Sequence, residues 1–304
     1  MDMAPPRTKA GRFFDEGFLA RLEQLHLVAK RLATRTSVGT RRSRRLGDGL
    51  EFADHRDYAS GDDIRFVDWS YYARMDKMLL RLFHQHSQAD VVIMLDVSAS
   101  MAPGGRLGKL NYARRAAAAL AYVAMGTLER VVCQPFADGL HRPMRTGRNR
   151  GQIFEVLDFL DAIEPGGPTR LSHSVAQLVA GERPKGTVVI LSDLMGCGEE
   201  LSDAIARLRH REYDVVVLHV HAPGDASPQL TGPMLLRDAE SRQAISLHVD
   251  AQLLGAYRAR WRQFAERCEH ECLSRGAIYV PAATDVSFET LVLNTLRRAG
   301  VLAE

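Results

Sequence analysis

A run of five apolar residues, Val91 to Leu95, passes directly into the polar segment Asp96 to Ser100. Apolar runs of this length with β-branched members are typical of strands that are buried on both faces in the middle of a parallel sheet. The polar residues that follow then lie where the strand ends, at the carboxyl edge at which open α/β sheets bind their ligands. The run therefore predicts both a central strand and the place of a binding site.

Beyond Asp90, short apolar runs alternate with stretches of helical periodicity. The predicted strands are Val91 to Leu95, Val131 to Phe136, Val188 to Leu191, Val215 to His219 and Ile278 to Val280. The predicted helices are Tyr112 to Leu128, Ile153 to Ile163, Leu171 to Val179, Leu201 to His210 and Leu253 to Leu273. This alternation predicts an α/β fold with a doubly wound, mostly parallel sheet, and the segment Met234 to Val249 predicts an additional hairpin.

The segment before Asp90 has a different pattern. Apolar residues recur at helical spacing from Phe13 to Leu32, which predicts an amphipathic helix. From Thr36 to Gln88, short segments are broken by polar and glycine-containing turns, which indicates a small β-rich unit. We therefore divide the chain into an N-terminal helix at 1–35, a β-rich unit at 36–88 and an α/β domain with C-terminal helices at 89–304.

Composition and the apolar runs bear on location. The chain has 304 residues, of which 46% are hydrophobic and 25% are charged, which is typical of a soluble globular protein. Its apolar runs fall short of the roughly 18 residues of a membrane span, and its beginning does not resemble a signal peptide. We expect a cytoplasmic protein without a transmembrane segment.

Cysteines and clustered arginines each allow two interpretations. Cys268 and Cys272 lie one helical turn apart around His270, but His270 points elsewhere on a helix, so two half-buried thiols are favoured over a metal site. The arginines of Arg41 to Arg45 could bind nucleic acid or acidic lipid. A solvated or partner-facing edge of a small β element is favoured, because no aromatic residues alternate with these arginines as stacking platforms would. Binding of nucleic acid is therefore not expected.

Oxygen-bearing side chains gather at the predicted strand ends. Asp96, Ser98 and Ser100 alternate along one turn, Thr169 follows a glycine-rich bend, and Asp193 ends another buried strand. Such a set suits a hard divalent ion, Mg²⁺ or alternatively Mn²⁺ or Ca²⁺, and leaves at least one coordination position to water or an outside ligand. This favours capture of an acidic residue from a partner protein. The alternative is that Asp96 and Ser98 merely cap the turn.

The same residues carry a resemblance. The pattern D-x-S-x-S from Asp96 to Ser100, a threonine in a later loop and the Ser-Asp pair ending at Asp193 are similar to the metal-ion-dependent adhesion site of the von Willebrand factor A domain. The resemblance implies a von Willebrand factor A or Rossmann-like fold. It also implies that Asp96, Ser98, Ser100 and Thr169 contact the ion directly or through water. Asp193 would either bind the ion itself or hold one of the ligands that do.

A second resemblance covers nearly the whole chain. The stretch RDYASGDDIRFVDWSYYARMDKMLLR, Arg56 to Arg81, resembles the signature of bacterial domain-of-unknown-function family fifty-eight, which joins this block to an A-type domain. Members often carry proline where this sequence has Ser60, and acidic residues where it reads FHQHSQ. Members accompany MoxR-type AAA+ ATPases, which implies an adaptor for such an ATPase in a chaperone-like or envelope-related process. His84 and His86 share a strand face but lack a third ligand, so no metal is predicted there.

The block from Arg56 to Arg81 also has a physical interpretation. Its arginines and aspartates can pair bidentately and fasten the β-rich unit to the sheet, with Trp69, Tyr71 and Tyr72 supplying apolar contact. The alternative is a recognition surface beside the metal. Because so many opposite charges close together usually satisfy one another, we favour the structural role.

Enzymatic functions fit less well. The stretch Pro103 to Leu110 nearly matches a phosphate-binding loop, but its first glycine and the hydroxyl after the lysine are missing, so it is interpreted as a surface bend that leads into the first helix. A Mg²⁺-dependent phosphatase or hydrolase with Asp96 as nucleophile remains the alternative, although a second aspartate is expected where Ser98 stands. We predict a metal-dependent protein-protein interaction module rather than an enzyme.

Overall fold

The computed structural model describes residues 14, 16–36, 46–59, 62–84, 90–104, 108–126, 129–147, 149–181, 186–198 and 200–299. Contacts divide the chain into two units. Residues 1–35 and 89–304 form one, the sheet domain, and residues 36–88 form the other, the 36–88 unit. The N-terminal helix thus packs as part of the sheet domain.

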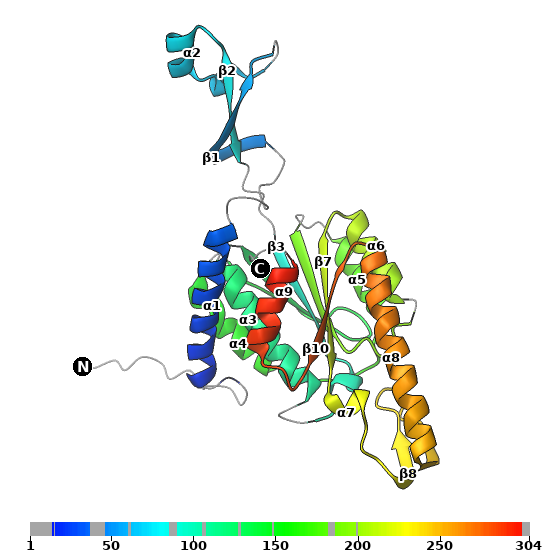
Figure 1. Cartoon of the computed structure of the whole chain (residues 1–304). Coiled ribbons are helices and arrows are strands. Elements are labelled where there is room, and N and C mark those ends of the chain that lie inside the picture. Colours follow the sequence, from blue (N-terminus) through cyan, green and yellow to red (C-terminus); the bar gives the residue numbers. More distant parts are fainter. Residues whose placement is uncertain are drawn as a thin grey trace, which may run out of the picture. The chain divides into compact units, whose positions relative to one another are not determined.

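A six-stranded sheet forms the centre of the sheet domain, in the order β10-β7-β6-β3-β4-β5 (Figure 1). Its strands are β3 (Asp90–Asp96), β4 (Arg130–Phe136), β5 (Met144–Arg145), β6 (Gly186–Ser192), β7 (Asp214–His221) and β10 (Ile278–Ala283). Neighbouring strands are parallel except β5, which pairs antiparallel with β4. The mostly parallel α/β sheet is therefore confirmed, and the two-residue edge strand β5 is too short to have a periodic signal.

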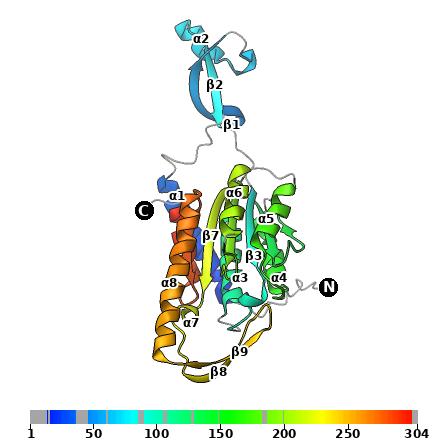
Figure 2. The same cartoon turned by 90° about the vertical axis from the view of Figure 1, so that its right-hand side faces the viewer.

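Helices cover both faces of this sheet (Figures 1 and 2). One face is covered by α3 (Lys109–Gly126), α4 (Ile153–Asp161) and α9 (Phe288–Arg298), and α1 (Glu16–Thr36) packs on the outside of α3 and α9. The other packs against α5 (Leu171–Ala180), α6 (Glu200–His210) and α8 (Ala251–Ser274). Successive strand residues point to opposite faces, which is why an unbroken apolar strand needs helices on each side.

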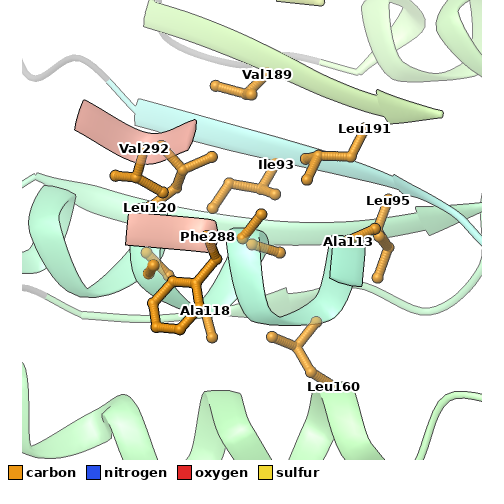
Figure 3. Close-up of a cluster of buried hydrophobic side chains, with 14 of the residues drawn as sticks. Ile93, Leu95, Ala113, Ala118, Leu120, Leu160, Val189, Leu191, Phe288 and Val292 are labelled. Atoms are coloured by element: carbon orange, nitrogen blue, oxygen red, sulfur yellow. The ribbon is translucent and has the colours of Figure 1, made fainter. Parts of the chain in front are cut away.

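Strand β3 shows how the core is divided. Ile93 and Leu95 face the cluster that contains α3, whereas Val92 and Met94 face the cluster that contains α5 and α6. Figure 3 shows Leu95 beside Ala113 of α3, with Phe288 of α9 and Ala118 of α3 on the Ile93 side of the cluster. Small alanine side chains let α3 lie close to the sheet, so the carboxyl end of β3 is held in a fixed place.

The helix α1 begins at Glu16 rather than at the predicted Phe13. Phe14 precedes the helix and is buried, and its ring lies 5.0 Å from the ring of Phe18. Phe18 in turn lies 5.0 Å from Phe288 of α9, and Arg21 forms an ion pair with Glu289 at 3.2 Å. The aromatic contacts explain why the apolar face predicted from periodicity is buried.

A two-stranded antiparallel sheet, β8 (Gly232–Arg237) and β9 (Ala244–Val249), follows β7 and the short helix α7 (Pro223–Ala226). The predicted hairpin is therefore confirmed. Its last strand leads into α8, whose N-cap is Asp250, with the carboxylate accepting a hydrogen bond from the amide of Leu253 at 2.7 Å. We call residues 232–249 the β8–β9 hairpin.

Asp250→Ala is expected to lower the free energy of unfolding of the sheet domain by about 1 kcal/mol, because the first turn of α8 loses its side-chain cap. Urea denaturation measures the change. Asp250→Asn is the matched control, since asparagine caps as well as aspartate does, and it should leave the midpoint nearly unchanged. Equal losses in both variants would show that the negative charge, not the hydrogen bond, is what matters.

The 36–88 unit consists of β1 (Leu46–Asp57) paired antiparallel with β2 (Leu79–His84), the short helix η1 (Ile64–Phe66) and the helix α2 (Trp69–Met75). Asp68 caps α2 by accepting a hydrogen bond from the amide of Tyr71. The unit therefore contains a helix as well as the predicted strands. The predictions on Arg41 to Arg45, on Ser60 and on the side chains of His84 and His86 lie outside the described residues.

Candidate metal centre

The candidate site lies where β3 and its neighbour β6 end. Asp96 is the last residue of β3, and Asp193 directly follows β6. β4, the next strand along the chain, lies on one side of β3, and β6 lies on the other. The strand order thus reverses between β3 and β6, and ligands of open α/β sheets bind at such a reversal.

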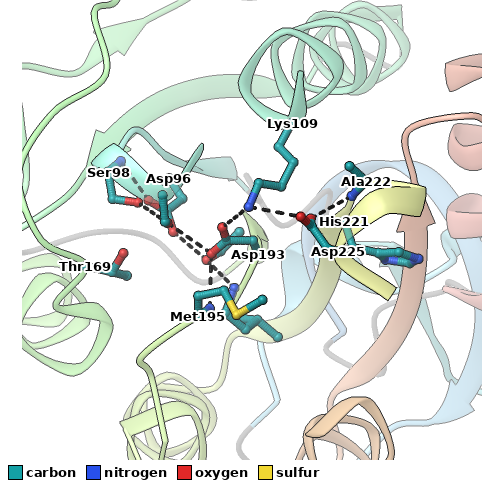
Figure 4. Close-up of polar contacts among 12 residues, drawn as sticks. Asp96, Ser98, Lys109, Thr169, Asp193, Met195, His221, Ala222 and Asp225 are labelled. Atoms are coloured by element: carbon teal, nitrogen blue, oxygen red, sulfur yellow. Dashed lines mark hydrogen bonds and ion pairs between the residues drawn. The ribbon is translucent and has the colours of Figure 1, made fainter. Parts of the chain in front are cut away.

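Four of the five predicted ligands are joined in one row of hydrogen bonds. The hydroxyls of Ser98 and Ser100 lie 3.0 Å apart, and Ser100 Oγ donates to Asp193 Oδ1 at 3.3 Å. Asp96 accepts from the amide of Ser98 at 2.9 Å and from Ser192 Oγ at 2.5 Å. Figure 4 shows Asp96, Ser98 and Asp193 around one point. Ser192, which the sequence interpretation had not singled out, orients the Asp96 carboxylate.

Thr169 is brought near by a loop but is paired differently. The glycine-rich bend lies against the turn after β3, because Gly166 donates its amide to Val97 O at 2.8 Å and Gly167 accepts from the amide of Ala99 at 2.9 Å. Gly167 has a φ of 81°, which favours glycine. Figure 4 draws Thr169 on the far side of Ser98 and Asp96 from Lys109. Its amide and hydroxyl both donate to Glu240 of the β8–β9 hairpin.

Lys109 is the residue of this site that sequence reasoning missed. Its Nζ donates to Asp193 Oδ2 at 2.6 Å and lies 3.6 Å from Asp225 Oδ2, and the Lys109 side chain is only 8% exposed (Figure 4). The interpretation of Pro103 to Leu110 as a surface bend is therefore wrong at its end, where α3 begins with a buried lysine. The sequence signal that could have indicated this role is a lysine at the start of the helix that follows β3.

Burial strongly affects Asp96, whose side chain is inaccessible to solvent. Its removal from water, and next the nearby negative charge of Asp193, raise the pKa of Asp96 to about 7, against the lowering effect of the hydrogen bonds from Ser192 and Ser98. Without a cation at this point, the carboxyl group therefore holds a proton at mildly acidic pH. Binding of a divalent ion requires the ionised form.

The stability of the protein in a chelator is expected to fall as the pH rises from about 4 to about 7. The unfolded chain releases the Asp96 proton near the ordinary pKa of 3.8, whereas the folded chain holds it up to about 7. The stabilisation that comes from holding this proton is therefore complete below the unfolded pKa of 3.8 and is lost as the pH rises through the folded pKa of about 7. Thermal unfolding measures the trend, and the slope should be smaller in Asp96→Asn. An equal slope in that variant would contradict the assignment.

The donor chemistry of the row fits a hard divalent ion. Its side chains offer carboxylate and hydroxyl oxygens, which are the ligands that Mg²⁺ prefers. Among the described residues, no group of three or more His, Cys, Asp or Glu side chains is placed to hold a metal ion, so a site here depends on hydroxyls. Lys109 does not fit this set of oxygen ligands, because its ammonium group adds a positive charge beside Asp193.

The cysteine pair of α8 is inert. Cys268 and Cys272 are buried, and burial raises the pKa of each thiol to about 12. Metals bind the thiolate form, and a raised pKa keeps these thiols protonated at neutral pH, which disfavours a metal site here. His270 between them is exposed, and the two thiols are buried rather than half-buried as predicted.

Charged residues of the 36–88 unit pair with one another. Arg56 pairs with Asp62 at 2.8 Å, Arg65 with Asp63 at 2.6 Å, and His55 with Asp68 at 3.0 Å. The predicted charge pairing is thus present within the unit. Trp69 and Tyr72 are 54% and 38% exposed, and the fastening of the unit to the sheet stays a prediction.

A known protein family matches most of this chain. The model of a family described as "Protein of unknown function DUF58" matches residues 54–269. No curated protein matches the sequence. In the part of the chain that the structure describes, no helix is long and apolar enough to cross a membrane.

Three solved structures are among those similar to this chain. The conserved hypothetical protein BatB from Bacteroides thetaiotaomicron has a TM-score of 0.43 at 17% identity, covering 69% of this chain and 98% of its own. An aerotolerance-related membrane protein from Bacteroides fragilis has a TM-score of 0.44 at 17% identity, covering 69% and 99%. The pilus adhesin SpaC from Lactobacillus rhamnosus GG has a TM-score of 0.43 at 10% identity, covering 71% and 30%.

Proposed function

The chain belongs to the family described as "Protein of unknown function DUF58", and we propose that it is a metal-dependent protein-protein interaction module. In this proposal its sheet domain is a von Willebrand factor A or Rossmann-like domain. Asp96, Ser98, Ser100, Thr169 and Asp193 hold Mg²⁺, or Mn²⁺ or Ca²⁺ in its place. A partner protein completes the centre by donating an acidic residue.

The row of hydrogen bonds from Asp96 through Ser98 and Ser100 to Asp193 carries the proposal. Two carboxylates and two hydroxyls that come from different strand ends converge at the strand-order reversal. Caps of a single turn would not reach from residue 100 to residue 193. An oxygen-rich point of this kind favours binding of a hard cation.

Each residue has a distinct role in this proposal. Asp96 and the hydroxyls of Ser98, Ser100 and Thr169 would hold the ion, and the bound ion would act as a Lewis acid that accepts a carboxylate oxygen. Ser192 keeps the Asp96 carboxylate in place through its 2.5 Å hydrogen bond. Lys109 holds Asp193 from the side of α3.

The partner is proposed to be a MoxR-type AAA+ ATPase in the cytoplasm. This part of the proposal rests on the resemblance of the block from Arg56 to Arg81 to its family. One metal-bridged carboxylate supplies limited affinity, so a partner must also cover neighbouring surface. Co-sedimentation of the purified chain with the MoxR-type ATPase of the same organism, with Mg²⁺ or with a chelator, tests it. Equal binding in both conditions would contradict metal dependence.

A Mg²⁺-dependent phosphatase or hydrolase fits the geometry less well. A nucleophilic carboxylate must reach a substrate phosphorus atom, whereas Asp96 is inaccessible to solvent and both of its oxygens accept hydrogen bonds. Ser98 stands where a second acid would act. Hydrolysis of p-nitrophenyl phosphate by the metal-loaded protein, lost in Asp96→Asn, would favour the enzyme instead.

A further inference from the structure

The carboxylate of Glu240 holds both hydrogen-bond donors of Thr169. Thr169 Oγ1 donates to Glu240 Oε1 at 2.9 Å, and the Thr169 amide donates to Glu240 Oε2 at 3.2 Å. Thr169 is a proposed ligand of the metal centre, and a hydroxyl that donates its proton keeps lone pairs for a cation. An acidic side chain of this same chain therefore already lies at the edge of the centre.

The turn that carries Glu240 is internally braced. Asp238 Oδ1 accepts hydrogen bonds from the amides of Glu240 at 3.2 Å and Ser241 at 2.6 Å, and from Ser241 Oγ at 2.7 Å. These bonds lower the pKa of Asp238, so its carboxylate stays charged at neutral pH. The amide of Asp238 closes the turn by donating to Gln243 O at 2.8 Å. Such bracing presents Glu240 in one position.

The β8–β9 hairpin buries little apolar surface. Leu235, Leu236 and Ile245 are exposed by 64%, 40% and 62%. Figure 2 draws β8 and β9 at the bottom of the sheet domain, near the lower end of α8. Val249 at the base of the hairpin is buried, but these three side chains are not part of the core, so the end of the hairpin that carries Glu240 can move away from Thr169 without opening the core.

Charge also favours a third carboxylate at this point. A divalent ion and Lys109 together bring three positive charges against the two negative charges of Asp96 and Asp193. Asp225 balances this excess in number, but it lies on the far side of Lys109, at 3.6 Å from Nζ, and not beside the ion. The carboxylate of Glu240 lies beside Thr169, which is a proposed ligand of the ion, and so on the opposite side of the site from Asp225.

We propose that Glu240, which is held by Thr169 and stands outside any three-acid group with Asp96 and Asp193, becomes an internal ligand of the metal centre when the ion binds and then occupies the position that a partner's carboxylate must take. The inference rests on the proposed function, because it requires the ion. It adds a regulatory step to that function. The hairpin closes the centre through Glu240, and a partner binds by displacing it, so the apparent affinity for the partner is reduced by the closed fraction.

Mn²⁺ reports directly on the proposed ligand. Glu240→Gln should weaken Mn²⁺ binding by about tenfold and should add about one exchangeable water to the bound ion, because a coordination position becomes open. Calorimetry gives the affinity, and water-proton relaxation gives the number of waters. Glu266→Gln, which removes an exposed charge from α8, is the matched control and should change neither value.

A blocked peptide with a single glutamate then tests the competition. It should bind the Mn²⁺-loaded Glu240→Gln variant at least about tenfold more tightly than the wild-type protein, since no internal carboxylate has to leave. Hydrogen exchange at the Thr169 amide should increase in the same variant without metal. That readout depends on the contact itself and confirms that the substitution released the loop.

The outcomes separate the two claims. If Mn²⁺ binds the wild-type protein but Glu240→Gln changes neither affinity, water number nor peptide binding, the internal ligand is refuted and the metal centre stands. If Mn²⁺ binds neither protein, the metal centre fails and the internal ligand fails with it. A circular dichroism spectrum and melting temperature like those of the wild type ensure that the variant is folded.

Discussion

Asp96→Ala is expected to lower the affinity for Mg²⁺ and Mn²⁺ by more than about a hundredfold, since loss of a direct ligand costs more than loss of a residue that merely orients one. Asp96 contributes a carboxylate at the end of β3, braced by Ser98 and Ser192. Asp193 is then the one carboxylate left in the row, and its charge is already paired with Lys109 at 2.6 Å. The stabilisation of the wild-type protein by Mg²⁺ should disappear with it.

Thermal unfolding with and without Mg²⁺ measures this loss, and Asp90→Asn is its matched control. Asp90 lies at the opposite end of the same strand, where it is buried and pairs with Arg130 at 3.1 Å. A general weakening of β3 would affect both variants. Loss of the Mg²⁺ effect in Asp90→Asn as well, or its survival in Asp96→Ala, would remove Asp96 from the centre.

Lys109→Met is expected to act in opposite directions on the metal-free and the metal-bound protein. Without metal, the Asp193 carboxylate, which is inaccessible to solvent, loses its partner at 2.6 Å. Breaking a buried ion pair in this way typically costs about 3–5 kcal/mol. With metal, the repulsion between the ion and the ammonium is gone, and the affinity for Mg²⁺ should rise by at least about tenfold.

Denaturation at neutral pH in a chelator, followed by titration with Mg²⁺, measures both effects of Lys109→Met. Lys77→Met is the matched control, because Lys77 pairs with Asp57 at 3.2 Å on an exposed surface and should contribute less than about 1 kcal/mol. Lys109→Arg keeps the charge and should retain most of the stability. A weaker affinity for Mg²⁺ in Lys109→Met would show that the lysine supports the centre rather than opposes the ion.

The local pattern of the chain predicts most of the fold. Strands such as β3 are unbroken apolar runs, and the helices between them repeat their apolar residues at helical spacing, so both kinds of element follow from residues close in sequence. Errors arise where tertiary contacts decide. Phe14 packs on Phe18 ahead of the helix, and α3 extends back to Lys109 because its ammonium reaches Asp193.

The candidate site is predicted in part for the same reason. Asp96, Ser98 and Ser100 form a local pattern, and Asp193 follows an evident strand. The contacts of Lys109 with Asp193 and of Thr169 with Glu240 join residues 84 and 71 positions apart. No spacing in the sequence indicates such pairs, because they depend on how the sheet order brings distant strand ends together.

Calorimetric titration of the full chain with Mg²⁺ and with Mn²⁺ tests most directly whether this edge of the sheet is a metal centre. The predicted result is saturable binding of both ions at a single site, with competition between them and with loss of the signal in Asp96→Ala. Absence of any binding heat for the folded wild-type protein, together with an unfolding temperature that neither ion changes, would contradict a metal-dependent function. The hydrogen-bonded row from Asp96 to Asp193 would then serve only to join β3 to β6.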